Sequence, residues 1–387
     1  MLHTLAIENY RSLRSIVVPL TNLNVITGPN GAGKSNLYKA LRLLADTATG
    51  GIVSSLAREG GLHSTFWGGP EKISRDMREG RVPIQGTRHR EPTRLKLGFA
   101  GDDFGYCITM GLPARPKESA FAHDPEIKRE CIWAGPVCRP DSILVDRNGP
   151  SVRARTEKVW ETLADGLSLF ESIFPQIVDP NNAPEVLLLR ETIRGWRFYD
   201  QLRTDVDAPC RIPRLGTLTP VLGHDGGDLA AAIQTIIEIG DENAVAASVD
   251  AAFPGARVNI AIQPDARFAI EFQQPGLVRP LSGAELSDGT LRFLLWLAAL
   301  LTPRPPSMMV LNEPETSLHP DLLPALAQLI HKAAENTQLW VVTHSPALIA
   351  ALGENSGARV IQLQKDLGQT QVKDQNLLDR PPWRWVE

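Results

Sequence analysis

The sequence predicts an α/β fold, and three observations support that class. Near the N-terminus, an apolar stretch at residues 23–27 leads into a glycine-rich loop and then into a segment with apolar positions at helical spacing. In the last third, short apolar stretches alternate with longer helical ones, an order typical of α/β proteins. Between these regions, alternating apolar and polar residues indicate paired strands. The 387 residues suffice for two or three domains, or for one domain with a large insertion.

The first part of the chain, residues 1–110, is expected to form a lobe made mainly of strands. Apolar or alternating stretches predict strands at residues 5–7, 16–18, 23–27, 95–99 and 106–110. From Ser35 to Leu44 the apolar residues recur at positions 37, 40, 41 and 44. We therefore expect a helix to begin directly after the glycine-rich loop.

The middle of the chain, residues 111–255, is expected to be an insertion of mostly helical character. Prolines are frequent up to Pro150, and no clear periodic pattern is present there. Helices are predicted over residues 155–174, 184–203 and 229–239. The last of these follows Gly226-Gly227-Asp228, which has the composition of a helix start.

The last part, residues 256–387, carries the clearest pattern and is expected to form a second lobe. Alternation at 258–262 and 268–272 predicts a hairpin that turns at Pro264-Asp265. Beyond it the pattern predicts helices at 291–301 and 322–334, and strands at 308–311, 339–343, 359–363 and 369–372.

Composition argues against several classes of protein. The net charge is -4 at pH 7, so the chain as a whole lacks the basic excess of many nucleic-acid binders. The N-terminus lacks the pattern of a signal peptide, and the most apolar window, residues 291–301, is shorter than the ~20 residues that span a bilayer. The four cysteines have no zinc-type spacing and are expected to be reduced and mostly buried. We therefore expect a cytoplasmic protein with no membrane partner.

The glycine-rich loop carries the most specific single motif. Its sequence from Gly28 to Ser35, GPNGAGKS, matches the phosphate-binding pattern G-x-x-x-x-G-K-[ST] at every fixed position. Glycines let backbone N–H groups turn toward a phosphate, and the following helix points its positive end at the same anion. Lys34 should reach the β- and γ-phosphates of ATP, and the Ser35 hydroxyl should bind Mg²⁺. The residues expected to contact the nucleotide here are Asn30, Gly31, Ala32, Gly33, Lys34, Ser35 and Asn36.

Further candidates for chemistry follow two of the predicted buried strands. Asn312 and Glu313 come after 308–311, in the manner of a Walker B strand. Glu313 has the position of a general base that orients the attacking water. Asn312 replaces the usual Asp; its amide can bond to Mg-bound water but lacks the charge that holds the metal. His344 follows 339–343 and could contact a γ-phosphate, although a lone histidine is more often structural.

Two adjacent stretches compete for the role of a second anion site, LSGAE at 281–285 and LSDGT at 286–290. The second directly precedes the apolar helix, so Ser287 or Asp288 can cap that helix and leave backbone N–H groups facing outward. Such a helix start can bind an anion, and we assign Ser287, Asp288 and Gly289 to nucleotide binding. A plain helix cap without a ligand accounts for the same pattern.

Taken together, these pieces resemble the ABC-type ATPase head of the SMC, RecF and OLD-like group. The resemblance rests on six segments in the expected order: Ile7–Tyr10, Gly28–Ser35, Leu286–Thr290, Asn312–Glu315, Ser317–Pro320 and Thr343–Pro346. It covers about the first fifty and the last hundred residues, and the long stretch between them would hold the arm or insertion typical of the group.

The resemblance implies a mechanism in which two heads enclose ATP. Lys34, Ser35, Glu313 and His344 would act on the nucleotide bound by their own chain. Ser287 and Gly289 would act in trans on the γ-phosphate held by a second copy, so the homodimer would form around ATP. ATP binding would engage the heads and hydrolysis would release them.

The sequence departs from the usual pattern of such heads in several places. The signature reads Ser-Asp-Gly-Thr rather than Ser-Gly-Gly-Gln, and His319 occupies the D-loop aspartate position; both variations suit the OLD and RecF-like branch. Gln85 is a candidate for the Q-loop glutamine by position alone. Because only residues 345–387 follow His344, we expect this chain to lack the second, nuclease domain of OLD-type proteins.

DNA is a candidate partner because two stretches are locally basic. Residues 71–96 hold eight Lys or Arg against four acids, and residues 190–214 hold six Arg against four acids. Such density could contact phosphates, and a solvated surface with many ion pairs explains it equally well.

Three function classes follow. The first is a DNA-associated ATPase in DNA repair or anti-phage defence. The second is a nucleotide-gated scaffold with little hydrolysis, motivated by Asn312, that controls a separate effector protein. The third, a subunit of a membrane transporter, is disfavoured because such subunits lack the long middle insertion.

Overall fold

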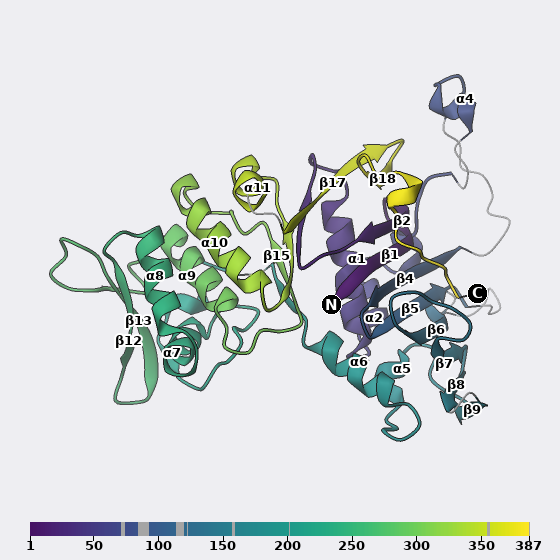
Figure 1. Cartoon of the computed structure of the whole chain (residues 1–387), viewed down its shortest axis with the longest axis horizontal. Coiled ribbons are helices and arrows are strands. Elements are labelled where there is room, and N and C mark those ends of the chain that lie inside the picture. The colour runs from purple at the N-terminus through teal and green to yellow at the C-terminus, as the bar shows by residue number, and fades with distance from the viewer. Residues whose placement is uncertain are drawn as a thin grey trace. The chain divides into compact units, whose positions relative to one another are not determined.

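The computed structural model describes residues 1–70, 74–83, 93–113, 120–121, 123–156, 159–200, 202–353 and 357–386 (Figure 1). The chain forms two compact units. The first unit consists of Met1–Thr21, Thr27–Gly195 and Ile361–Glu387, and the second of Asn22–Ile26 and Trp196–Val360.

The first unit is built on an eight-stranded sheet in which every neighbouring pair is antiparallel. Its spatial order is β2 (Leu13–Pro19), β1 (Leu2–Tyr10), β4 (Arg94–Gly101), β5 (Phe104–Gly111), β6 (Glu126–Ala134), β7 (Ile143–Asn148), β8 (Ser151–Thr156) and β9 (Val159–Ala164). The strands predicted at the start of the chain and at 95–99 and 106–110 are confirmed.

Helix α1 (Lys34–Thr47) packs on this sheet against β1 and β4, as Figure 1 shows. It buries Leu37, Leu41 and Leu44, the apolar positions that predicted it. The other helices of the first unit are α2 (Ile52–Arg58), α3 (Leu62–Thr65), α4 (Arg75–Arg78), α5 (Ile173–Gln176) and α6 (Pro184–Arg194). Strand β18 (Gln369–Val372) and most of β17 (Ala358–Asp366) complete the unit, with one turn of 3-10 helix at Leu377–Asp379.

The predicted helix over residues 155–174 is wrong. The chain there forms the end of β8 and then β9, which pair through the register Thr156↔Val159 and Arg155↔Trp160. Pairing with the neighbouring strand outweighs the weak helical spacing of the apolar residues. The helix predicted over 184–203 ends at Arg194, because residues 197–199 pair with β15 (Met308–Asn312) in a parallel sheet instead. The middle of the chain is therefore part strand and part helix.

The second unit contains a parallel sheet in the order β10 (Arg197–Tyr199), β15 (Met308–Asn312), β16 (Gln338–Val342) and β3 (Leu23–Thr27). These strands are almost wholly apolar and buried, as expected of parallel strands covered on both faces. The strands predicted at 308–311 and 339–343 are thus confirmed.

The described residues of the second unit form the helices α7 (Leu229–Ile239), α8 (Glu242–Ala252), α9 (Asp288–Leu300), α10 (Leu323–Ala334) and α11 (Pro346–Gly353). The predicted hairpin is present as β12 (Arg257–Ile262) and β13 (Arg267–Gln273), with the short strands β11 (Arg214–Leu215) and β14 (Leu281–Ser282) along one edge of β13. Helix α9 is the centre of the core, since ten of its thirteen residues are buried. Two single turns of 3-10 helix lie at Pro209–Arg211 and Pro320–Leu322.

The α/β class predicted from the sequence is confirmed. Within the described part of the chain, every helix is too short or too polar to cross a bilayer.

Candidate functional site

The phosphate loop runs from Gly28 to Ser35 and has a backbone that only glycine tolerates at two positions. Gly28 and Gly33 have φ angles of 147° and 107°, in the region that L side chains rarely adopt. A Cβ at Gly28 would collide with the carbonyl oxygen of Leu363, and one at Gly33 would collide with the hydroxyl of Thr370. The glycines of the motif therefore serve the shape of the loop as well as its approach to a phosphate.

Lys34 is the first residue of α1 and lies under the loop. Its side chain is almost wholly buried, and its Nζ donates hydrogen bonds to the carbonyl oxygens of Gly28 at 2.7 Å and Pro29 at 3.3 Å. No side chain caps the helix at Gly33, and Ser35 is exposed at the first turn. A loop with a buried ammonium group and a helix start capped by no side chain has the chemistry of a phosphate site.

The back of the phosphate loop is held by a hydrogen-bond relay that the sequence did not reveal. Thr370, on β18, donates to the carbonyl oxygen of Ala32 at 2.8 Å and lies 2.7 Å from the hydroxyl of Ser12. Asn36 donates to that same Ser12 hydroxyl at 2.7 Å. All three side chains belong to the first unit, and Thr370 is completely buried.

In the second unit, the candidate catalytic residues stand at one edge of the parallel sheet. Strands β15 and β16 run in the same direction, so Asn312 and Thr343 come at neighbouring carboxyl ends, where α/β proteins bind ligands. Glu313 follows directly, and its N–H donates to the Val342 carbonyl oxygen at 2.8 Å. Its φ of 49° is unusual for a residue with a side chain, a strain that tends to occur at functional sites.

His344 lies between two carboxylates. Its Nδ1 is 3.7 Å from an oxygen of Glu313 and 3.6 Å from one of Glu315. The side chains of His344 and Glu313 are about half exposed, with 55% and 45% of their surface accessible, whereas Glu315 is at 9%. The histidine and the candidate general base are thus neighbours on an accessible edge.

Glu315 was not assigned a role from the sequence, yet it organises this edge. Its Oε1 accepts hydrogen bonds from the Thr343 hydroxyl at 2.6 Å and from the backbone N–H groups of His344 and Ser345, both at 3.2 Å. Among the residues that the structure describes, nothing hydrogen-bonds to its other, buried oxygen. The Asn312–Glu315 motif contained this residue, but only the fold brings it to the turn after β16.

The stretch proposed as the signature lies where α9 begins. Ser287 is the N-cap of α9, and its hydroxyl oxygen accepts the N–H of Thr290 at 3.2 Å. Ser287 and Gly289 line an open pocket together with Ser317, His319 and Asp321. The competing stretch 281–285 forms the short strand β14 and a turn in which Glu285 accepts from Ser282.

The structure thus groups the predicted residues in three places. The phosphate loop is in the first unit, whereas Asn312, Glu313 and His344 share one edge of the second unit, and Ser287, Asp288 and Gly289 lie at another place in it. The chain itself links the first two groups, because β3 pairs with β16 through Ile26 and Val342, and the loop starts two residues after Ile26. Gln85 lies outside the described residues.

The expected Mg²⁺ would depend on few protein ligands. In the parts of the chain that the structure describes, no group of three or more His, Cys, Asp or Glu could hold a metal ion. The hydroxyl of Ser35 and the amide of Asn312 offer hard oxygen atoms, which suit Mg²⁺, and this ion usually keeps several waters and binds phosphate as well. Each of these two oxygen donors, taken by itself, therefore suits a metal that a nucleotide carries.

The two basic stretches are rich in ion pairs where they are described. Arg190 and Arg194 both pair with Glu191, and Arg203 pairs with Asp205. In α4, Arg75 pairs with Glu79. These arginines resemble a solvated, ion-paired surface.

Comparison with known proteins identifies the family. Residues 23–350 match the model of the family described as "AAA domain, putative AbiEii toxin, Type IV TA system". No curated protein matches the chain. Among solved structures, an SMC head bound to the C-terminal winged-helix domain of ScpA has a TM-score of 0.50 and 14% identity, over 97% of this chain and 98% of that one.

Two further SMC heads are similar at lower scores. The head from Pyrococcus furiosus, solved with the C-terminal domain of ScpA, has a TM-score of 0.48 and 13% identity over 96% of this chain and 95% of that one. The head from Thermotoga maritima has a TM-score of 0.46 and 13% identity over 97% and 99%. The chain belongs to the family of AAA domains that its residues 23–350 match, and its fold is that of an ABC-type, nucleotide-binding ATPase head.

Proposed function

We propose that this protein binds Mg-ATP in the Gly28–Ser35 loop and hydrolyses it to ADP and phosphate. One observation carries the proposal. Glu313 and His344 lie at the carboxyl ends of two adjacent parallel strands, and the next strand, β3, continues directly into the GPNGAGKS loop. Because α/β proteins bind ligands at the carboxyl ends of such strands, this arrangement supports a role in nucleotide chemistry for Glu313 and His344 and, separately, for the loop.

Each candidate residue would then have its own role in ATP binding or hydrolysis. Lys34 would leave the Gly28 carbonyl oxygen and pair with the β- and γ-phosphates. Ser35 and Asn312 would hold Mg²⁺, which would neutralise charge on the phosphate oxygens. Glu313 would accept a proton from the water whose oxygen attacks the γ-phosphorus, while the bond to the β-phosphate oxygen breaks and ADP leaves. His344 would donate a hydrogen bond to the γ-phosphate from its place 3.7 Å from Glu313.

We further propose that two copies enclose ATP, with Ser287 and Gly289 of each facing the nucleotide of the other. The shared pocket of Ser287, Gly289 and Ser317 supports a surface adapted to a phosphate group. We also propose that the chain is organised as a first lobe (1–110), an insertion (111–255) and a second lobe (256–387). DNA repair or anti-phage defence in the cytoplasm is the setting we propose, with DNA as a partner.

A second candidate function is an ATP-held scaffold with little turnover, which controls a separate effector protein. Asn312 favours it, because an amide at this position lacks the charge that helps to hold Mg²⁺. An SMC head of the same fold has been solved with a domain of another protein, ScpA, bound to it. An Asn312→Asp variant separates the two candidates: a rise in turnover of tenfold or more would favour the scaffold for the natural protein.

Titration calorimetry with Mg-ATP tests the proposal itself. The natural chain should bind one ATP per copy, and Lys34→Ala should weaken binding by at least about tenfold, because a charged hydrogen bond to phosphate contributes about 1.5–3 kcal/mol. Light scattering of the Glu313→Gln variant should detect a dimer with ATP and a monomer without it. An ATP affinity that is equal in the natural chain and in Lys34→Ala would refute the assignment of the loop.

A further inference from the structure

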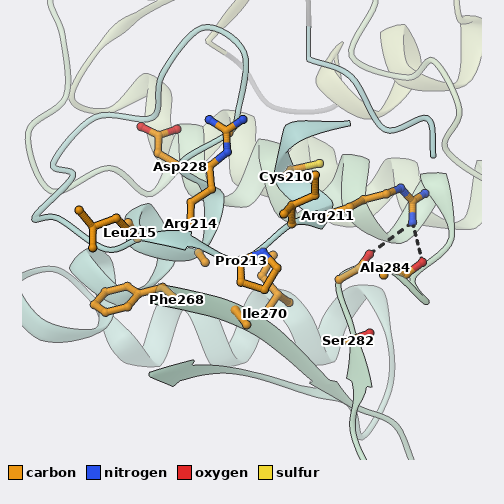
Figure 2. A pocket seen from close by; sticks show the side chains of 16 residues that line it. Cys210, Arg211, Pro213, Arg214, Leu215, Asp228, Phe268, Ile270, Ser282 and Ala284 are labelled. Carbon is orange, nitrogen blue, oxygen red and sulfur yellow. Dashed lines mark hydrogen bonds between the residues drawn. The ribbon is translucent and has the colours of Figure 1, made fainter. Parts of the chain in front are cut away.

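Arg211 donates hydrogen bonds from all three guanidinium nitrogens, and its partners include the turn that precedes α9. The residue ends a short 3-10 turn and lines a pocket of about 200 Å³ beside that turn (Figure 2). Its side chain is only 10% exposed. In Figure 2 the guanidinium group reaches toward Ala284, away from the apolar wall made by Phe268 and Ile270.

The guanidinium group links two segments of the chain that lie far apart in sequence. On one side, Nε donates to the carbonyl oxygens of Thr204 and Asp205 at 3.1 and 2.9 Å. On the other, Nη1 donates to the carbonyl oxygen of Leu286 at 2.8 Å, with longer bonds to Gly283 and Ala284. Nη2 donates to the Asp288 carboxylate at 2.6 Å. Arginine is suited to this place because it stays protonated and has five donors in a fixed plane.

Asp288 poses an electrostatic difficulty that this contact resolves. It is the first residue of α9, it lies between Ser287 and Gly289, and it is 56% exposed. A carboxylate at this position would repel a phosphate that approaches the same helix start. The pairing with Arg211 places a positive charge against the Asp288 carboxylate, which offsets its repulsion of an anion at the helix start.

We propose that Arg211 is a positioning residue, which neutralises Asp288 and fixes the 283–288 turn so that Ser287 and Gly289 can accept the γ-phosphate held by a second copy of the chain. This inference rests on the proposed ATP-enclosing dimer. The charge of Arg211 would allow an aspartate to occupy the signature next to a phosphate. We therefore expect substitutions of Arg211 and Asp288 to have coupled effects on dimerisation.

Two other arginines lie near Asp288 or its turn, and one of them provides the control variant. Arg292 stands one turn along α9 from Asp288; its Nε is buried, and no described residue hydrogen-bonds to it. Arg279 pairs with Glu285 of the same turn at 2.7 Å, but its side chain is 68% exposed. Because exposed ion pairs contribute little, Arg279→Ala is a matched control that removes an arginine from the same turn.

The test is a double-mutant cycle on ATP-dependent dimerisation. Arg211→Ala, Asp288→Asn, the double variant and Arg279→Ala are each prepared in the Glu313→Gln background. For every chain, the protein concentration at half-dimerisation with saturating Mg-ATP is measured by light scattering, and ATP affinity is measured by titration calorimetry. Arg211→Gln, which drops the charge and keeps a donor, repeats the cycle in case the alanine variant does not fold.

Removing Arg211 should raise the half-dimerisation concentration about tenfold or more, corresponding to ~1.4 kcal/mol, and should leave ATP affinity within about twofold. In the chain that lacks Arg211, Asp288→Asn should lower the half-dimerisation concentration at least threefold. Arg279→Ala should have the same half-dimerisation concentration as the Glu313→Gln parent. The inference is overturned if the parent dimerises and removing Arg211 changes nothing, or if Asp288→Asn gives no rescue. Failure of the Glu313→Gln parent to bind ATP or to dimerise would instead refute the proposed function on which the inference rests.

Discussion

The phosphate loop and the turn before α9 both place the start of a helix where a phosphate could bind, yet different forces hold them. The loop takes its shape from glycines with left-handed backbone angles and from one threonine hydroxyl behind it. The turn before α9 is held by an arginine side chain contributed from a remote segment. A local motif can therefore be read from the sequence, whereas a turn held by a remote side chain cannot.

The edge formed by β15 and β16 shows the same contrast between a residue that a local motif identifies and one that only the fold identifies. Glu313 is recognisable by its position after an apolar strand, whereas Glu315 acquires its role only through its contacts with Thr343 and His344. Substitutions in the loop and at this edge should therefore separate the binding of ATP from its hydrolysis.

The largest effect is expected from Glu313→Gln. Removing the general base should lower kcat by about 100- to 10,000-fold. ATP affinity should stay within about threefold, because the loop is unchanged. Single-turnover phosphate release together with calorimetry measures both quantities. If the variant instead lost ATP affinity and kept its kcat, the assignment of Glu313 to the reaction and of the loop to ATP binding would be wrong.

Gly33→Ala should damage binding rather than reaction. An alanine there combines a strained φ of 107° with a collision against Thr370, so ATP affinity should fall by about 100-fold or more, given about 1–3 kcal/mol for the strain alone.

Gly31→Ala is the matched control for Gly33→Ala. Its φ is also positive, at 77°, but a Cβ there meets nothing within 4 Å, so only the backbone strain remains and the loss should be about tenfold. Equal losses at the two positions would mean that the contact with β18 does not shape the loop.

Glu315→Ala should reduce kcat about tenfold. Three donors around the turn after β16 lose their shared acceptor, at a cost of about 1–3 kcal/mol. Thr343→Val removes one of these donors and should reduce kcat about threefold. If Thr343→Val impairs kcat as strongly as Glu315→Ala, the threonine and not the carboxylate organises the turn.

Thr370→Val should have the smallest effect, a rise in KM for ATP of about 3- to 10-fold, because one or two hydrogen bonds worth about 0.5–1.5 kcal/mol each are lost. Ser12→Ala breaks the same relay, so the double variant should be no worse than about the stronger single one. Additive losses in steady-state kinetics would contradict a shared relay.

Much of the fold could be predicted from the sequence because its local and tertiary preferences agree. Strands β15 and β16 are apolar throughout, and helix α9 is apolar on nearly every face, as their buried positions require. The region 155–174 could not be predicted, because β9 is a half-exposed edge strand whose pattern is weak and whose pairing with β8 decides its structure.

The candidate site follows the same rule. Lys34, Glu313 and Ser287 belong to short motifs whose chemistry depends on adjacent residues, so the sequence alone named them. Thr370 and Arg211 contact their partners across 338 and 77 residues of chain, and no local signal marks such side chains. Residues of this kind become visible only when the fold brings them together.

Steady-state phosphate release with Mg-ATP, compared between the natural chain and Lys34→Ala at equal concentration, tests the central claim most directly. The account predicts release clearly above that of the variant. Release equal to that of Lys34→Ala, from a natural chain that also fails to bind ATP, would contradict it.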